Sequence, residues 1–444
     1  MNRINFKPIK IALLLLSTLW AGFANVQALH LTLKDALNYA VQNNCTIRKA
    51  KLDIERGKFK TDEVRAQALP QINGTGTLTY NPIIGSLVSD FGTFKMGREW
   101  NSSAGVQLSQ QLFNQQVFTG LKASKASEDY YNLNASLSEE QIIEQVSAAY
   151  YQILVNHRQL TVVENNIKNA QKTERIISTN FKNGLAKKID LDRVKVNISN
   201  LNTQKEQLAN AITQQENSLK YAMGMPVSTS ITIPEIELST VTAVAQLQDS
   251  ININNRTEYK LMQTQQNLLG LQKKAYKAEY YPSLALSGNF TSTGQSNSFD
   301  LYRSSGNAFW YDASSIGLTL RIPIFNGNAT RSRVRQAEID IQKNKEDIRN
   351  TSQSLNLAYE NAKIQIKNSL NTINSQNENV RLAQEIYTST QNNYNNGLAS
   401  LTDLLDAENA LTSAQSNYSQ ALLNYKVAEI QLIKSNGNIK SLLN

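Results

Sequence analysis

The fold is decided by Phe181-Lys182-Asn183-Gly184-Leu185 and its counterpart Tyr394-Asn395-Asn396-Gly397-Leu398. The two stretches lie 213 positions apart and share an aromatic residue, an asparagine, a glycine and a leucine in the same order. At the same offset, Asp190 matches Asp403. Because this period is far longer than a solenoid repeat, we infer that a whole structural unit is duplicated.

Long segments without glycine or proline flank both glycine turns. These segments are residues 121–183 and 185–223 in the first half, and 328–396 and 398–436 in the second. At 1.5 Å per residue, the longest helix would span about 100 Å. Large side chains recur every seven residues in the last segment: Leu404, Leu411, Tyr418, Tyr425 and Leu432. The pattern predicts coiled-coil hairpins, with an ordinary soluble helical bundle as the alternative.

Segments with a period of two lie between the helices. Ile316, Leu318 and Leu320 alternate with small or polar residues, which predicts strands with one apolar and one polar face. The strand pairs are expected at 69–80 and 100–113, and at 281–292 and 309–325. Four strands cannot close a barrel, which needs about eight. Because lipid does not tolerate open strand edges, a membrane location requires several chains to share one barrel.

Aromatic residues gather at the start of the second strand of each pair. They are Trp100, Trp310, Phe309 and Tyr311. Aromatic side chains at strand ends are typical of the girdle at a membrane–water interface. A soluble β-subdomain with an aromatic core is the alternative.

The remaining segments follow from composition. Residues 1–28 have the basic, apolar and small-residue order of a signal peptide, and mature residues 29–223 and 251–437 form the two repeats. Residues 224–250 are a linker and 438–444 a C-terminal tail. With 41% hydrophobic residues and one apolar run, the chain is not a bundle of membrane-spanning helices.

The composition also excludes several functions. The net charge of +9 is spread without a basic stripe, so no nucleic-acid partner is expected. One cysteine, Cys45, and two histidines leave no disulfide and little for a metal site. No phosphate loop, catalytic triad or paired-carboxylate cleft is visible. We therefore expect neither an enzyme nor a bound cofactor.

Two motifs carry a resemblance to the TolC family of outer-membrane efflux and secretion channels. They are Leu320-Arg321-Ile322-Pro323-Ile324-Phe325-Asn326-Gly327 and Tyr394-x-x-Gly397-Leu398-x-x-x-x-Asp403-Leu404-Leu405-Asp406-Ala407, set in the duplicated order of strands and helical hairpins. The resemblance covers essentially the whole mature length. It implies an α+β membrane protein whose four strands per chain complete a twelve-stranded barrel in a homotrimer, above a periplasmic helical tunnel.

The resemblance also implies the role and the partners. The trimer would be a passive exit duct in the outer-membrane lipid of a Gram-negative bacterium. It would serve a tripartite efflux pump or a type I secretion system, opened by a periplasmic adaptor protein and an inner-membrane transporter. A periplasmic adaptor-like coiled-coil protein and a structural envelope spacer are the alternatives.

Site residues follow by resemblance at the periplasmic tip. Asp403 and Asp406 would form the pore constriction, although Ser400-x-x-Asp403 also fits a helix-capping pattern. The adaptor would dock on two turns, Gly184-Leu185 and Gly397-Leu398.

The resemblance also implies contacts that hold the tip closed. Asp190 and Tyr394 are expected to take part. The basic residue that some members carry two positions after the second glycine is replaced by Ala399, so Lys187 or Lys188 would have to take its role.

Overall fold

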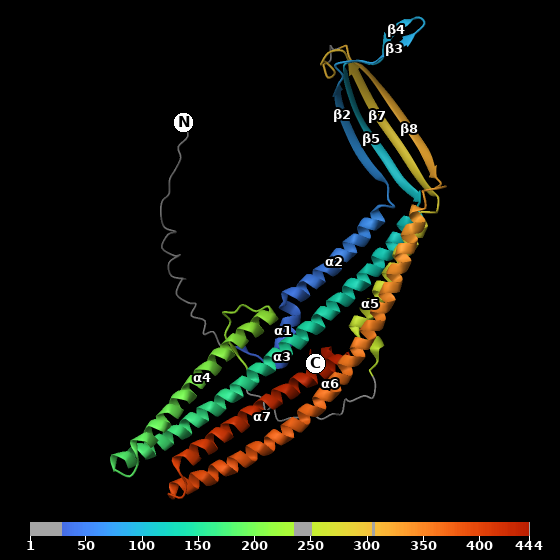
Figure 1. The fold of residues 1–444 in the computed structure, drawn as a ribbon. Helices are drawn as coiled ribbons and strands as arrows, with labels where there is room; N and C mark the ends of the chain where they lie inside the picture. Colours follow the sequence, from blue (N-terminus) through green and yellow to red (C-terminus); the bar gives the residue numbers. More distant parts are fainter. Residues whose placement is uncertain (1–28, 235–250, 304–306, 444) are drawn as a thin grey trace, which may run out of the picture.

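The computed structural model describes residues 29–234, 251–303 and 307–443. The predicted signal peptide, residues 1–28, and linker residues 235–250 lie outside the described residues. Figure 1 shows a long helical bundle with a sheet at one end. Along the described residues, no helix combines the length and apolar character needed to cross a membrane.

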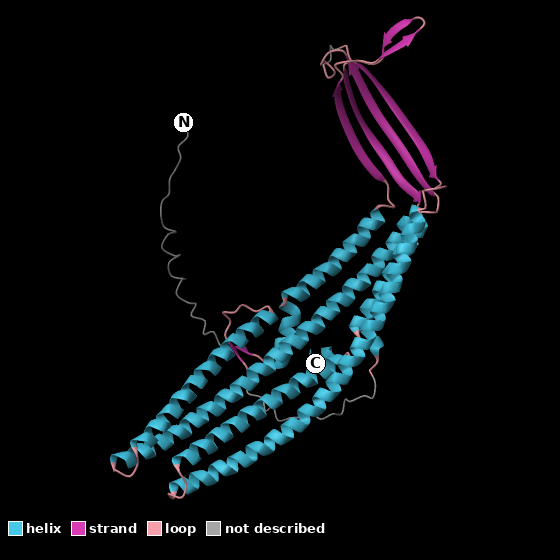
Figure 2. Cartoon of the chain, in the orientation of Figure 1, coloured by secondary structure: helices cyan, strands magenta, loops and turns pink. Residues whose placement is uncertain are grey.

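Two antiparallel hairpins form the bundle, which confirms the predicted helices (Figure 2). The first pairs α3 (Gln115–Lys182) with α4 (Lys188–Met223), and the second pairs α6 (Ala329–Asn395) with α7 (Leu401–Ser435). Helix α3 also contacts α7, which places α4 and α6 on the two outer sides (Figure 1).

Shorter elements continue the bundle where α4 and α7 end. They are β1 (Leu29–His30), α1 (Leu33–Asn43), α2 (Cys45–Ala66), β6 (Ile231–Thr232), η1 (Ile253–Asn255), α5 (Thr257–Ala278) and η2 (Ile439–Leu443). At the first junction, Nδ2 of Asn44 donates a 2.6 Å hydrogen bond to the carbonyl of Ala222. At the second, Nη1 of Arg256 donates a 2.8 Å hydrogen bond to the carbonyl of Ser435. Each junction therefore satisfies a carbonyl that the helix end leaves unpaired.

The sheet has four antiparallel strands in the order β2, β5, β7, β8. They are β2 (Gln71–Tyr80), β5 (Trp100–Phe113), β7 (Ser283–Ser296) and β8 (Phe309–Arg321). The β5–β7 ladder joins the two repeats into one sheet, while β2 and β8 are its edges.

Strand bounds differ from the predicted ones at several ends. Strand β7 runs on to Ser296, whereas β8 ends at Arg321, so residues 322–325 lie in the connection to α6. Pro323 has no N–H to donate to a ladder, which explains why β8 does not continue through it. A further hairpin, β3 (Ser86–Ser89) with β4 (Gly92–Lys95), extends beyond the sheet without a sequence prediction (Figure 1).

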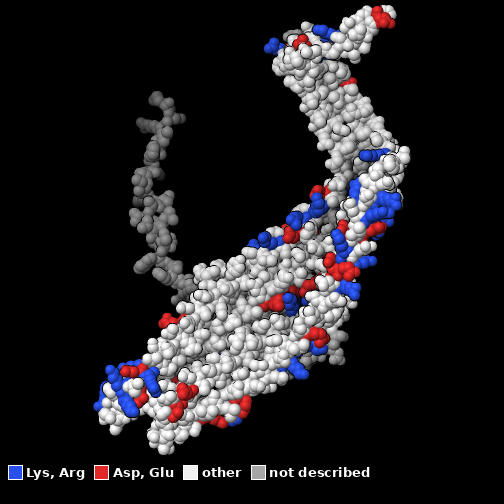
Figure 3. Space-filling view, in the orientation of Figure 1, with Lys and Arg blue, Asp and Glu red and all other residues white. Residues whose placement is uncertain are grey.

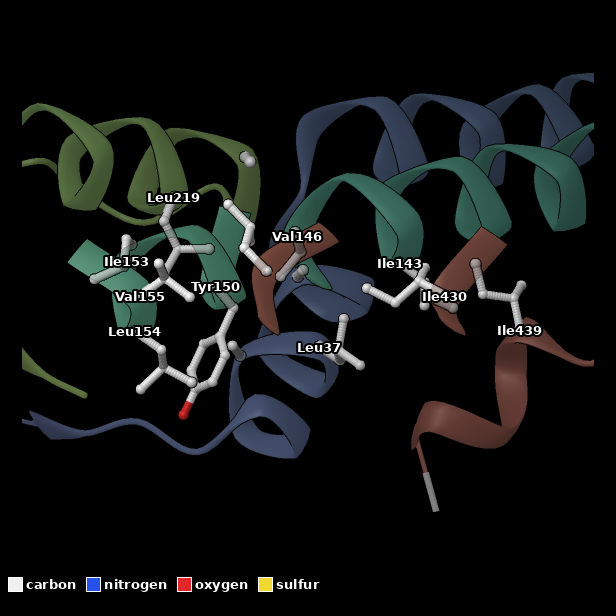
Figure 4. Close-up of a cluster of buried hydrophobic side chains, with 14 of the residues drawn as sticks. Leu37, Ile143, Val146, Tyr150, Ile153, Leu154, Val155, Leu219, Ile430 and Ile439 are labelled. Atoms are coloured by element: carbon white, nitrogen blue, oxygen red, sulfur yellow. The ribbon is translucent and has the colours of Figure 1, made fainter. Parts of the chain in front are cut away.

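The main core lies midway along the bundle and is formed by α1, α3, α4, α6, α7 and η2; Figure 4 shows part of it. Tyr150 is fully buried there, and its hydroxyl donates a 3.1 Å hydrogen bond to the carbonyl of Leu31. Ile439 of η2 is 1% exposed, so part of the predicted C-terminal tail is built into this core. The core holds the two hairpins together well away from their glycine turns.

Candidate functional site

The two glycine turns adopt the same geometry at the free end of the bundle. Gly184 and Gly397 have φ values of +74° and +73°, the left-handed region that glycine adopts without strain. The amide of Leu185 bonds the carbonyl of Asn180 at 2.7 Å, and Leu398 repeats this contact with Asn393 at 2.8 Å. These are the bonds of a Schellman motif, which ends the helix and turns the chain.

Both leucines that follow the glycines face solvent. Leu185 and Leu398 are each 78% exposed. An isolated exposed leucine is ordinary on a protein surface. Two leucines at equivalent positions of two matching turns give one chain a pair of apolar contact points at the same end.

The helix after the second turn starts with a complete capping box. The Ser400 hydroxyl accepts from the amide of Asp403 at 3.2 Å, and the Asp403 carboxylate accepts from the Ser400 amide at 2.9 Å. Hydrogen bonds from the Ser400 side chain, and then from its backbone, lower the pKa of Asp403 below its usual value. Asp403 is therefore ionised at neutral pH and stabilises the start of α7.

Asp406 lies one turn further along α7 and is exposed. Residues three apart share a helix face, so the two aspartates present negative charge on one side of the tip. Across the described residues, no group of three or more metal-ligating side chains is placed to hold a metal ion.

The helix after the first turn, α4, begins with two lysines. Lys187 is the N-cap of α4 and makes no side-chain capping bond, and Lys188 follows it; both are exposed. Cations at a helix N-terminus oppose the helix dipole, in contrast to the acid-capped start of α7. Figure 3 shows Lys and Arg side chains gathered at this tip.

Asp190 and Tyr394 come together at the tip from different hairpins. Tyr394 packs at the edge of an apolar cluster formed by Ile177, Leu191, Val194 and Leu401. Burial, and then the negative charge of Asp190, raise the pKa of Tyr394. The two residues predicted to act in tip closure are therefore close neighbours within one chain.

A contact that the sequence did not predict joins the two tips. Nη1 of Arg193 on α4 donates a 2.7 Å hydrogen bond to the hydroxyl of Thr402 on α7. The two residues are 209 positions apart, so no local pattern could have revealed the pair. Within one chain this hydrogen bond links the two tips through Arg193, and the roles expected for Lys187 and Lys188 stay predictions.

The sheet, at the end of the molecule opposite to the glycine turns, is the second candidate functional surface. In the register of the four strands, Ile72, Leu108, Gly288 and Ile316 stand side by side. Since successive side chains point to opposite faces, one face is apolar and the other carries serine, threonine, asparagine and glutamine. The apolar face is formed by Ile72, Leu78, Val106, Leu108, Phe290, Ile316, Leu318 and Leu320.

The four predicted interface aromatics lie at the end of the sheet that is remote from the helices. Trp100 contacts the tilted rings of Tyr80 and Phe299, whose centroids lie 4.5 and 4.7 Å from its own. The indole of Trp310 donates a 3.1 Å hydrogen bond to the carbonyl of Leu301. By strand alternation, Phe309 and Tyr311 lie on the face opposite to Trp310.

The chain is similar to known outer-membrane proteins over most of its length. The chain is 23% identical over 412 residues to the probable outer membrane lipoprotein SilC of Salmonella typhimurium, covering 90% of this chain and 84% of SilC. It is 23% identical over 419 residues to the cation efflux system protein CusC of Escherichia coli K12, covering 91% and 86%.

A solved structure shares the fold. The outer membrane protein VceC of Vibrio cholerae superposes with a TM-score of 0.73 at 16% identity, covering 91% of this chain and 96% of VceC. The model of the family described as outer membrane efflux protein matches residues 36–225 and 253–438. The chain therefore belongs to the outer membrane efflux protein family.

Proposed function

We propose that three copies of this outer-membrane efflux protein assemble into one channel and export substrates as a passive duct. The observation that carries the proposal is the sheet. Its two edge strands, β2 and β8, are each paired on one side only among the described residues, and one face of the sheet is apolar. Three copies supply twelve strands, enough to close a barrel in which every edge is paired.

The helices would extend the barrel as a tunnel. Each of the two longest helices, 68 and 67 residues, spans about 100 Å, and both hairpins point away from the sheet. The glycine-turn tips then form the periplasmic entrance. Because the related CusC is named as part of a cation efflux system, we favour a tripartite efflux pump over a secretion system.

The entrance would be narrowed by the acidic side of α7. Three chains contribute Asp403 and Asp406, and a narrow mouth lined by one sign of charge concentrates cations. Asp403 does this while it also caps α7, because an exposed capping carboxylate keeps its charge. Asp190, Tyr394 and the Arg193–Thr402 bond would hold the two tips together in the resting state.

A periplasmic adaptor and an inner-membrane transporter would open the entrance. The six exposed leucines per trimer, Leu185 and Leu398 of each chain, would provide the repeated docking points. Leu185→Ser and Leu398→Ser are expected to reduce efflux while the trimer stays in the membrane. The measurement is drug or metal susceptibility together with trimer level, and unchanged susceptibility in the double variant would contradict the docking role.

The channel itself is tested by purification in detergent and by recording in planar bilayers. The expected result is a trimeric mass and a small cation-selective conductance. A folded, monodisperse monomer without conductance would refute the proposal, since four strands in one chain cannot close a barrel.

A further inference from the structure

A cavity lies where the sheet meets the helices in the second repeat. It has a volume of about 530 Å³ and is enclosed by the end of α5, the adjoining ends of β5, β7 and β8, and the starts of α3 and α6. Figure 3 shows basic side chains gathered at this junction. The volume falls in the range of small-molecule sites. The side chains that set the chemistry of the cavity are Arg321, Arg333, Glu279, Asn114, Asn326 and Thr319.

The floor of the cavity is the polar face of the sheet. Ser283 pairs with Arg321 and Ala285 with Thr319, and these four residues line the cavity. They alternate along β7 and β8 with the residues of the apolar face, so their side chains point away from it. The strands β2, β5, β7 and β8 contain two charged residues, Asp312 on the apolar face and Arg321 on the polar face. Arg321 is therefore the one charge on the polar face of these four strands.

The guanidinium of Arg321 has no partner among the described residues. It is exposed, donates no hydrogen bond there and forms no ion pair. Arg333, in contrast, forms a 2.8 Å ion pair with Oε2 of Glu279, which also accepts a 2.7 Å hydrogen bond from the hydroxyl of Thr330. Glu279 is the one acidic residue lining the cavity, and two donors already engage it. Arg321 is therefore available to an anion from solution, and its planar fork suits a carboxylate or a phosphate.

The first repeat has an equivalent cavity without these arginines. It has a volume of about 460 Å³ and lies between α2, β2 and β5. Ser109 of β5 takes the place there of Arg321 of β8. Gln67, the C-cap of α2, takes the place of Glu279, the C-cap of α5. Glu63 is the one charged residue lining this cavity among the described residues, so the junction can be built without arginine and the positive charge is specific to the second repeat.

We infer that the cavity of the second repeat binds a small organic anion that carries a carboxylate or a phosphate. Arg321 pairs with the charged group, and Arg333 adds positive charge beside it. The side chain of Asn114 caps α3 through Oδ1, which leaves its Nδ2 to donate to a further oxygen of the ligand.

This inference rests on the proposed channel and names a substrate class for it. The polar face of the sheet would line the lumen, so three copies would place three such cavities at the base of the barrel. They lie at the opposite end of the tunnel from the acidic entrance formed by Asp403 and Asp406. Once the entrance is open, an exported organic anion would be held at this level before it passes through the barrel.

Isothermal titration calorimetry with citrate tests the site in the full-length, detergent-solubilised protein at low salt and pH 7. Arg321→Gln should weaken citrate binding about tenfold or more, because it removes a charge-assisted hydrogen bond. Arg331→Gln is the matched control, since Arg331 is an exposed arginine at the start of α6 that does not line the cavity. The control should bind citrate like the parent protein. Both variants should keep the parent's unfolding temperature, because neither arginine has a partner to lose among the described residues.

Planar bilayer recording tests whether the site faces the lumen. Citrate should reduce the conductance of the parent and of Arg331→Gln, and should reduce that of Arg321→Gln much less. Absent citrate binding, equal weakening by both substitutions, or equal block of the parent and Arg321→Gln would overturn the inference, and a conducting trimer would still support the channel. A monomer that binds citrate through Arg321 would refute the channel and leave the binding site standing, because one chain supplies the whole cavity.

Discussion

Glu408 offers the sharpest test of the electrostatics near the tip. It lies two turns along α7, is 6% exposed, and its Oε1 has no hydrogen-bond partner among the described residues. Tyr387, Leu404 and Leu411 form an apolar cluster beside it. Burial raises the pKa of Glu408 from 4.5 to about 7.

The direction of the stability effect follows from that shift. The folded protein holds the Glu408 proton more tightly than the unfolded chain, so this group contributes stability below pH 4.5. The contribution disappears as the pH rises toward about 7, where the folded protein must bury a charge. At about 1.36 kcal/mol per pKa unit, the difference between acid and neutral pH is about 3 kcal/mol.

Glu408→Gln removes the titration and keeps the shape of the side chain. The variant should match the wild type near pH 4.5 and resist local opening better at pH 8, by up to about 300-fold. Hydrogen exchange of the α7 amides around this residue measures the opening, comparing both proteins at the same pH. Glu385→Gln, an exposed ion-pair member on α6, is the control and should show no such pH dependence.

One result of the hydrogen-exchange experiment would contradict the raised pKa of Glu408. If the ratio of exchange rates between wild type and Glu408→Gln is the same at pH 5 and pH 8, Glu408 titrates near its ordinary pKa. Burial would then not be sufficient to raise the pKa of Glu408.

Three further predictions concern the tip and the helix ends. Replacing Asp403 and Asp406 together by Ala should weaken cation preference in single-channel recording, whereas unchanged selectivity with reduced helix stability would leave only the capping role. Arg193→Ala removes the bond between the tips and should raise the resting conductance; an unchanged closed level would contradict a role in closure. Gly224→Ala should lower the thermal unfolding temperature more than Gly184→Ala, because both have positive φ but only at Gly224 would a Cβ lie 2.5 Å from the carbonyl oxygen of Asn43. Equal decreases in unfolding temperature would show that the positive φ, and not the contact with Asn43, determines the loss of stability.

Much of the fold could be predicted because its signals are local. The seven-residue ladder from Leu404 to Leu432 and the alternation from Ile316 to Leu320 follow directly from helix and strand geometry. Matching glycine turns then revealed the duplication, and the order of motifs indicated the family. These predictions are confirmed by the fold and by the family match.

The candidate site was predicted less completely. The sequence placed Asp190, Tyr394 and the two aspartates of α7 at the tips, and their roles stay proposals. It did not predict Arg193 as the link between hairpins, nor that Glu408, a polar residue between two ladder positions, would be buried. The sequence around Arg193 and around Glu408 does not distinguish either residue from a charged residue on a protein surface.

By itself, the sequence determined the helices, the strands, the turns and their repetition, because each depends on side chains within a few residues of one another. Only the tertiary structure decided that β5 pairs with β7 across the two repeats and that α3 rather than α4 packs against α7. It also decided which equivalent faces stay uncovered, such as those of α4 and α6. The two halves carry nearly the same local pattern, so local preferences cannot choose between equivalent faces; packing between distant segments makes that choice.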